Sequence, residues 1–298
     1  LDEATQSLYI DKQFAEAGDP ETAVKRSLLL VLKSPRFLYP ELPDANADAY
    51  DAASRLSFAL WDSGPDQNLL GAAAEGKLGK PEEIASQAER MLRSSKAKSK
   101  ISAFFHHWLA MEEGMDMTKD KSAYPGFSDA LLADLRTSLE LFVDQVVWSE
   151  DSDYRQLLLA DYLLLNERLS KFYGLGAVET DRFARVNIEG QERSGVITHP
   201  YLLATFAYHK SSSPIHRGVF LTRNIVGRAL KPPPMAIQFM DGRFDPSLTM
   251  REKVTELTAP DNCMSCHSVI NPLGFSLENF DGVGRARTMD NDNLVDTV

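Results

Sequence analysis

The sequence has few of the features that mark a disulfide scaffold, a membrane protein or a nucleic-acid-binding protein. Its 298 residues include only two cysteines, which excludes a disulfide-rich scaffold. No apolar run approaches the roughly 20 residues of a membrane span, because Asp161 and Asn166 interrupt the longest leucine-rich stretches. A formal net charge of −11 argues against nucleic acid as a partner, since binding phosphate requires a basic surface. The acidic balance fits either solubility alone or docking to a basic partner.

The alternating pattern of β-strands is also scarce, and helical periodicity takes its place. Between residues 131 and 147 the apolar side chains recur every three or four residues, which predicts an amphipathic α-helix. Further helices are predicted at 23–32, 50–61, 81–92, 100–109, 157–173, 201–207, 218–230 and 249–257, and a short one through Leu69 and Leu70. Residues 183–188 form the one stretch with strand character. We therefore expect a mainly α fold.

Three consecutive prolines suggest a boundary late in the chain. Residues 232–234 lack backbone donors and cannot continue a helix, so the segment through Pro246 is predicted to be a linker or a long surface loop. After it, Thr249 and Glu252 match a capping box that opens a short helix. We expect a helical body over residues 1–210 and a small C-terminal module over residues 211–298.

Both cysteines belong to that module and lie in one five-residue run, Cys263-Met-Ser-Cys266-His267. Two thiols at this spacing can each add to a vinyl group of one haem, and the adjacent histidine can then ligate the iron. A structural zinc site would need two further Cys or His ligands from distant parts of the chain. A thioredoxin-like dithiol would be expected in an α/β context that the helical pattern does not provide. The motif therefore predicts one covalently attached haem c, with His267 as an iron ligand.

The residues that follow the motif fit a haem pocket. Small cytochromes commonly place a proline carbonyl where it accepts a hydrogen bond from the ligand histidine and a leucine against the porphyrin, and Pro272 and Leu273 stand at those positions. Phe275 can supply apolar wall. Arg285 is a candidate partner for a haem propionate, because a guanidinium matches a carboxylate, although a solvated surface arginine is an equally good interpretation.

Several motifs resemble those of the planctomycete-type cytochrome c multidomain proteins. The resemblance covers about residues 25–290 and rests on SPRFLY (34–39), ASRLSF (53–58), LNERL (165–169), SSPIHRGVF (212–220), PPP (232–234), TMRE (249–252), CMSCH (263–267), NPLGF (271–275) and ENFD (278–281). It implies a helical domain of unknown function followed by a haem c module. Many relatives have Asp where this chain has Asn271, a change that leaves the haem ligands intact.

The resemblance also implies an exported bacterial c-type cytochrome. Thioether attachment of haem in bacteria takes place after export, so we expect a periplasmic, cell-surface or extracellular protein. A first residue other than Met is consistent with removal of a signal peptide. Another small domain often follows in this family.

The second axial ligand of the iron stays open at this stage. Candidates are His209, His216, Met235, Met240, Met250 and Met289. Among them we favour His209, which flanks the motif at 212–220, but a vacant sixth position is also consistent with the sequence. Six-coordinate haem suits electron transfer, whereas an open face permits peroxide or small-ligand chemistry.

Two functions therefore remain. The first is transfer of single electrons to or from a redox partner protein or a fused catalytic domain. The alternative is a haem enzyme, a peroxidase-like or oxygenase-like oxidoreductase with an open distal iron site. The sequence does not identify an acid–base pair specific to that chemistry. A third interpretation is a carbohydrate-linked interaction protein whose haem module serves a neighbouring catalytic module.

Overall fold

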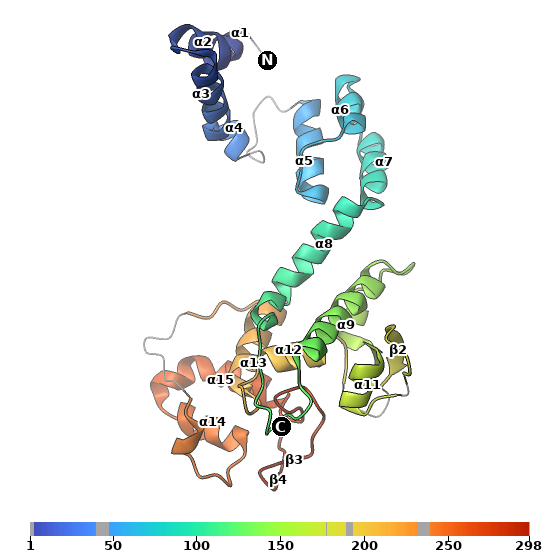
Figure 1. The fold of residues 1–298 in the computed structure, drawn as a ribbon, viewed down its shortest axis with the longest axis vertical. Coiled ribbons are helices and arrows are strands. Elements are labelled where there is room, and N and C mark those ends of the chain that lie inside the picture. The colour runs from blue at the N-terminus through green and yellow to red at the C-terminus, as the bar shows by residue number, and fades with distance from the viewer. Residues whose placement is uncertain (1–2, 40–47, 177, 189–192, 232–238, 298) are drawn as a thin grey trace. The chain divides into compact units, whose positions relative to one another are not determined.

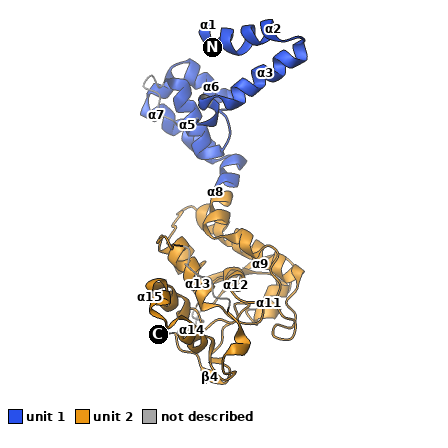
Figure 2. Ribbon diagram, turned by 90° about the vertical axis from the view of Figure 1, so that its left-hand side faces the viewer, with its two compact units in different colours: residues 1–101 blue, residues 102–298 orange. Residues whose placement is uncertain are grey.

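The protein is described by a computed structural model that covers residues 3–39, 48–176, 178–188, 193–231 and 239–297. Helices make up 58% of it and strands are few, which confirms the predicted mainly α fold. The chain forms two compact units, residues 1–101 and residues 102–298 (Figure 2). The boundary lies within helix α8 (Ser95–Trp108). The module boundary predicted at residue 210 therefore falls inside the second unit, and remains a prediction about sequence modules.

The first unit is entirely helical in its described part (Figure 1). Its elements are α1 (Glu3–Gln6), the π-helical turn η1 (Ser7–Asp11), α2 (Lys12–Glu16), α3 (Pro20–Lys33), α4 (Pro35–Leu38), α5 (Ala49–Trp61), α6 (Gln67–Ala74), the 3₁₀ turn η2 (Lys77–Gly79) and α7 (Pro81–Leu92). Asp48 forms a capping box with Asp51 at the start of α5, and Pro81 occupies the first turn of α7. A core gathers between α5, α6 and α7, where the Trp61 indole donates to the Met91 carbonyl. The helices predicted at 50–61 and 81–92 are confirmed.

The second unit combines helices with two short antiparallel sheets. Its helical elements are η3 (Met111–Gly114), α9 (Asp129–Val147), α10 (Gln156–Leu159), α11 (Glu167–Tyr173), α12 (Pro200–Thr205), α13 (Pro214–Phe220), the π-helical turn η4 (Leu221–Ile225), η5 (Asp241–Arg243), α14 (Met250–Thr258) and α15 (Asp261–Phe275). Strands β1 (Tyr162–Leu165) and β2 (Ala184–Asn187) pair with each other, as do β3 (Met289–Asp290) and β4 (Asn293–Leu294). The apolar stripe predicted for 131–147 is buried along α9.

The continuous helix predicted over 157–173 is wrong. The chain there forms α10, then β1, then α11. All four residues of β1 are buried, and a short buried strand has the same unbroken apolar pattern as a buried helix. The Asn166 side chain ends the strand and starts α11 by accepting a hydrogen bond from the amide of Leu169. Its partner β2 confirms the strand predicted near residues 183–188.

The helix predicted over 218–230 is displaced in the structure. It begins at Pro214, where the Ser213 hydroxyl accepts from the His216 amide, and its helical turns end at Ile225. Gly227 then has φ of +73°, a left-handed conformation that terminates a helix. The predicted capping box is confirmed: the Thr249 hydroxyl and the Glu252 carboxylate satisfy each other's backbone amides at the start of α14. The proline run at 232–234 lies outside the described residues.

The backbones of helices α13 and α15 lie in close contact, which is possible because Gly218 and Gly274 have no side chain at the contact. A Cβ added at Gly218 would lie 2.1 Å from the carbonyl oxygen of Ile270, and one at Gly274 would lie 1.9 Å from that of Pro214. Both distances are far below van der Waals contact. The segment 212–220 therefore supports the helix that carries the cysteine motif.

Candidate cofactor site on helix α15

The CMSCH motif lies in the first two turns of α15. The helix starts directly after Pro260, whose carbonyl accepts from the Cys263 amide at 2.8 Å. Residues separated by three or four positions share one side of a helix, so Cys263 lies on the same side as both Cys266 and His267. All three side chains are partly buried, and neither cysteine forms a disulfide. The sequence predicted the motif but not the helix that displays it.

A cavity of about 580 Å³ opens beside this helix. Its lining residues come from α14, α15 and the turn between them: Arg251, Thr255, Thr258, Ala259, Met264, His267, Ser268, Asn271, Pro272 and Phe275. His267 therefore lines the cavity, whereas neither Cys263 nor Cys266 is among its lining residues. The volume falls within the range of about 300–1,000 Å³ that is usual for cofactor sites.

The His267 ring is held by a chain of side-chain hydrogen bonds. Its Nδ1 lies 2.8 Å from Oδ1 of Asn271, and Nδ2 of Asn271 donates to the Thr258 hydroxyl at 2.8 Å. Thr258 in turn donates to the Val254 carbonyl. Because the Asn271 amide nitrogen is used toward Thr258, its oxygen accepts from His267, so Nδ1 carries the proton and the Nε2 lone pair is available as a ligand.

This arrangement differs from the expected role of Pro272. The carbonyl of Pro272 accepts from the Ser276 amide at 3.2 Å, as in an ordinary last helical turn, and it is the Asn271 side chain that bonds to the histidine. Pro272 and Phe275 both line the cavity, and the largely buried Phe275 also packs against Met250 and Val254. Leu273 is partly buried and lies outside the lining.

Like Cys263, Cys266 and Leu273, the predicted site residues Arg285 and His209 do not line the cavity. The Arg285 guanidinium stacks over the Phe172 ring of α11, with Cζ 4.0 Å from the ring centroid. His209 is exposed, and its backbone carbonyl accepts from the Asp120 amide. The guanidinium that does line the cavity belongs to Arg251, which appears in the sequence motifs only within TMRE (249–252). Arg251 is the second residue of α14. It lies one helical turn before Thr255, which also lines the cavity, so the helical spacing alone places the two side chains on one face.

None of the candidate second ligands lines the cavity in the described part of the chain. Met250 is buried against Phe275, whereas Met240 and Met289 are exposed. Nδ1 of His216 lies 3.0 Å from the Ser213 hydroxyl, and Met235 falls outside the described residues. Met264 does line the cavity, but it lies one turn before His267 on the same helix, so it cannot reach the opposite side of an iron bound there.

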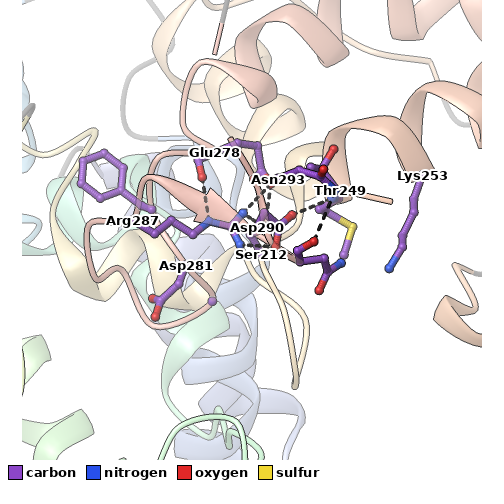
Figure 3. Close-up of polar contacts among 12 residues, drawn as sticks. Ser212, Thr249, Lys253, Glu278, Asp281, Arg287, Asp290 and Asn293 are labelled. Atoms are coloured by element: carbon purple, nitrogen blue, oxygen red, sulfur yellow. Dashed lines mark hydrogen bonds and ion pairs between the residues drawn. The ribbon is translucent and has the colours of Figure 1, made fainter. Parts of the chain in front are cut away.

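A buried ionic cluster anchors the segment that follows α15. Arg217 of α13 is 1% exposed and Glu278 is 2% exposed, and their side chains approach to 3.4 Å. Arg217 also donates to the carbonyls of Leu277 and Phe280. On the other side of Glu278, Arg287 contacts its carboxylate at 2.9 Å (Figure 3). Burial raises the pKa of Glu278 against the opposing effect of the two arginines, and burial lowers the pKa of Arg217 to about 10.

The same cluster reaches the start of α14. Arg287 contacts Asp290 at 2.7 Å, and the second oxygen of Asp290 accepts from the Met250 amide at 2.7 Å (Figure 3). Two neighbouring side chains, Asn291 and Asn293, donate to carbonyls just before α14. The chain after α15 therefore fixes the helix that forms the other wall of the cavity.

Metal clusters and membrane-spanning helices are both absent from the described residues. They contain no group of three or more His, Cys, Asp or Glu side chains placed to hold a metal ion, which a zinc site on Cys263 and Cys266 would require. In the same part of the chain, no helix is both long enough and apolar enough to cross a bilayer.

Comparison with known proteins identifies two domain families in the chain. Residues 47–175 match the family model described as PSD4, Protein of unknown function (DUF1592). Residues 193–290 match the model described as PSCyt3, Protein of unknown function (DUF1588). These are planctomycete cytochrome c domain families, and they fit the resemblance carried by the sequence motifs. No curated protein and no solved structure matches the chain.

Proposed function

We propose that this chain, whose two matched regions are planctomycete cytochrome c domain families, is an exported c-type cytochrome with one covalently attached haem. Cys263 and Cys266 would form the thioether bonds, and His267 would ligate the iron. The expected activity is transfer of single electrons to or from a redox partner protein or a fused catalytic domain. Export follows from the chemistry, because haem is attached through thioethers outside the bacterial cytoplasm.

One observation carries the proposal: His267 faces a cavity with its Nδ1 proton already engaged. The hydrogen bond to Asn271 leaves Nε2 as the ligating nitrogen, which is the arrangement that a metal-bound histidine requires. The two thiols precede this ring by four residues and by one residue on α15, at the spacing of the haem attachment motif, although neither lines the cavity. The motif and the free Nε2 of His267 are the two features that support the proposal.

The protein's own residues have separate tasks in this site. When bound, haem supplies an iron that changes oxidation state by one electron. Asn271 and Thr258 orient the His267 ring and keep its proton on Nδ1. Phe275 and Ala259 provide apolar wall. The buried cluster around Glu278 holds the chain after α15 to the start of α14.

Electron transfer and enzymatic function are distinguished by ligand binding. The protein is produced in a bacterial host that matures c-type cytochromes, and spectra of the reduced and oxidised forms are recorded with and without carbon monoxide and cyanide. An inert spectrum supports the electron carrier. Tight, fast binding at neutral pH supports the second candidate, a peroxidase-like or oxygenase-like haem enzyme.

A further inference from the structure

A second cavity, of about 330 Å³, opens beside the first turns of α9. Its lining comes from α9, from residues 115–118 after η3, and from Tyr201 of α12, all within the second unit. The volume lies at the small end of the range of about 300–1,000 Å³ that is usual for ligand sites. The described lining does not include Cys263, Cys266 or His267, so this cavity can be tested independently of the proposed haem.

The part of the lining that belongs to α9 forms one stripe. Asp129, Leu132, Ala133 and Arg136 recur at three- and four-residue spacing, so their side chains lie on one face of the helix. Seven residues of helix separate the ends of the stripe by about 10 Å. The stripe therefore runs from a carboxylate, over two apolar side chains, to a guanidinium.

The Arg136 guanidinium has donors to spare for a ligand. Its Nε is buried and forms no hydrogen bond within the described part of the chain. The Glu140 carboxylate, one turn further along α9, lies 3.6 Å from that nitrogen and also contacts Nε2 of His106 at 3.2 Å. Because a guanidinium has five N–H donors, this single loose contact leaves most of them for an anion in the cavity.

Tyr201 lines the cavity with a hydroxyl that is already engaged. The side chain is fully buried, and its hydroxyl donates to the Met111 carbonyl at 2.6 Å. Burial raises the pKa of Tyr201 to about 12, against the opposing effect of the nearby Arg136 charge. The phenol therefore stays neutral and does not compete with a ligand for Arg136.

The other end of the stripe carries negative charge. Asp129 is exposed there, and Asp116 adds a second exposed carboxylate to the lining. No ion pair involves either carboxylate in the part of the chain that the structure describes. The cavity thus offers a cation at one end of α9's stripe and unpaired anions to the same ligand.

We infer that this cavity binds a small zwitterion whose carboxylate and ammonium are separated by several carbon atoms. The ligand carboxylate pairs with the fork of Arg136, and the ligand ammonium pairs with Asp129. The carbon chain between them lies over Leu132 and Ala133. A simple anion meets two carboxylates in this cavity and a simple cation meets the guanidinium, so the order of charges selects a ligand that carries both.

The probe is ε-aminocaproate, which carries both charges at neutral pH. Its binding to the purified full chain is measured by isothermal titration calorimetry at low ionic strength, beside caproate and hexylamine, which each carry one charge. We expect saturable binding with a dissociation constant of about 1 mM, as befits so small a ligand. Each single-charge analogue should bind about tenfold more weakly. Equal affinity for caproate, or no saturable binding up to about 20 mM, overturns the inference.

Three variants test the assigned residues. Arg136→Gln should weaken binding of ε-aminocaproate about tenfold, and Asp129→Asn should narrow the difference between ε-aminocaproate and caproate. Arg155→Gln is the matched control, because the exposed Arg155 pairs with Asp153 and does not line the cavity. Wild-type affinity in Arg136→Gln, or an equal loss in Arg155→Gln, contradicts the inference.

Two further measurements keep the test readable. Circular dichroism checks that each variant is folded, and Arg136→Lys, which keeps the charge but loses the fork, replaces Arg136→Gln if the latter is not, with a smaller loss expected. The absorption spectrum is recorded during the same titration of the wild-type protein. We expect the haem bands to stay unchanged, whereas a shift on adding ε-aminocaproate places the ligand at the iron and overturns the inference.

Discussion

Nδ1 of His267 lies 2.8 Å from Oδ1 of Asn271, one turn further along the same helix. Asn271 is 6% exposed and is itself fixed by the Thr258 hydroxyl of α14. The histidine ring is therefore oriented by both helices that form the cavity. The oxygen of a neutral amide accepts the hydrogen bond from Nδ1 here.

Replacing this amide by a carboxylate should lower the reduction potential. In Asn271→Asp the acceptor becomes anionic, which gives the imidazole more electron density and stabilises the oxidised iron. If the effect matches the 10–100-fold typical of such outer partners, the midpoint falls by about 60–120 mV. Spectroelectrochemical titration of the holoprotein measures it.

Asn262→Asp is the matched control for that experiment. It makes the same change of charge on the exposed first turn of α15, five residues before His267. We expect a much smaller displacement of the midpoint. Equal displacements in the two variants would mean that only net charge matters, and that the hydrogen bond to Asn271 has no special role.

Gly274→Ala should destabilise the second unit. The added Cβ would lie 1.9 Å from the Pro214 carbonyl oxygen, so α13 and α15 would have to separate. Overpacking of this kind costs about 1–3 kcal/mol, and a backbone contact places this case at the upper end. Gly242→Ala, where a Cβ meets no atom within 4 Å, is expected to change the free energy of unfolding by no more than about 0.5 kcal/mol. Urea unfolding followed by tryptophan fluorescence compares them, and similar midpoints would contradict the observed packing.

The buried cluster predicts a large cost for Arg217→Leu. The substitution leaves Glu278 buried without its Arg217 contact, and leaves the carbonyls of Leu277 and Phe280 without this donor. Removing one partner of a buried pair typically costs about 3–5 kcal/mol. Arg155→Leu removes an ion pair whose arginine side chain is 71% exposed, and should cost less than about 1 kcal/mol. The same urea measurement applies, and a cost for Arg217→Leu as small as that of Arg155→Leu would refute the role of the cluster.

A buried histidine makes the stability depend on pH. His199 is 1% exposed; its Nδ1 accepts from the Tyr201 amide and its Nε2 lies 3.2 Å from the Ser138 hydroxyl. Burial lowers the pKa of His199 to about 3, from an ordinary value near 6.5. Above pH 6.5 the ring is neutral in both states and has no effect on the pH dependence. As the pH falls below 6.5, the unfolded chain binds a proton that the folded chain refuses, so stability declines by about 1.4 kcal/mol per pH unit until about pH 3.

His199→Asn isolates this effect, because asparagine keeps a side-chain oxygen for the Tyr201 amide but cannot be protonated. The free energy of unfolding is measured for both proteins between pH 6.5 and pH 4.5. We expect the free energy of unfolding of the wild-type protein to fall more steeply with decreasing pH than that of the variant, by about 1.4 kcal/mol per pH unit. Parallel curves would show that His199 is not neutral in the folded state.

The sequence predicted elements well where a long segment has an amphipathic helical pattern. The stripe on α9 and the capping box of α14 are local signals, and each appears where expected. The run Leu163-Leu164-Leu165 was misassigned to a helix, because it forms a strand by pairing with β2, some twenty residues later in the chain. Nothing within the run itself distinguishes the two structures.

The site was predicted as a motif but not as a geometry. The spacing of Cys263, Cys266 and His267 is readable in the sequence, whereas the acceptor for the histidine proton depends on the helix that puts Asn271 one turn away. Arg285 was a candidate partner for a haem propionate, with a solvated surface arginine as an equal alternative, and its guanidinium stacks on the Phe172 ring instead. Arg251 precedes the motif on a different helix, and only the packing of α14 against α15 brings it to the cavity.

The central claim is the covalent attachment of haem at Cys263 and Cys266. Its most direct test is the intact mass of the protein purified from a bacterial host that matures c-type cytochromes, compared with that of Cys263→Ser/Cys266→Ser from the same host. The account predicts that the denatured wild-type chain carries the mass of one haem and that the double variant carries none. A wild-type chain at the bare polypeptide mass, colourless in solution, would contradict it.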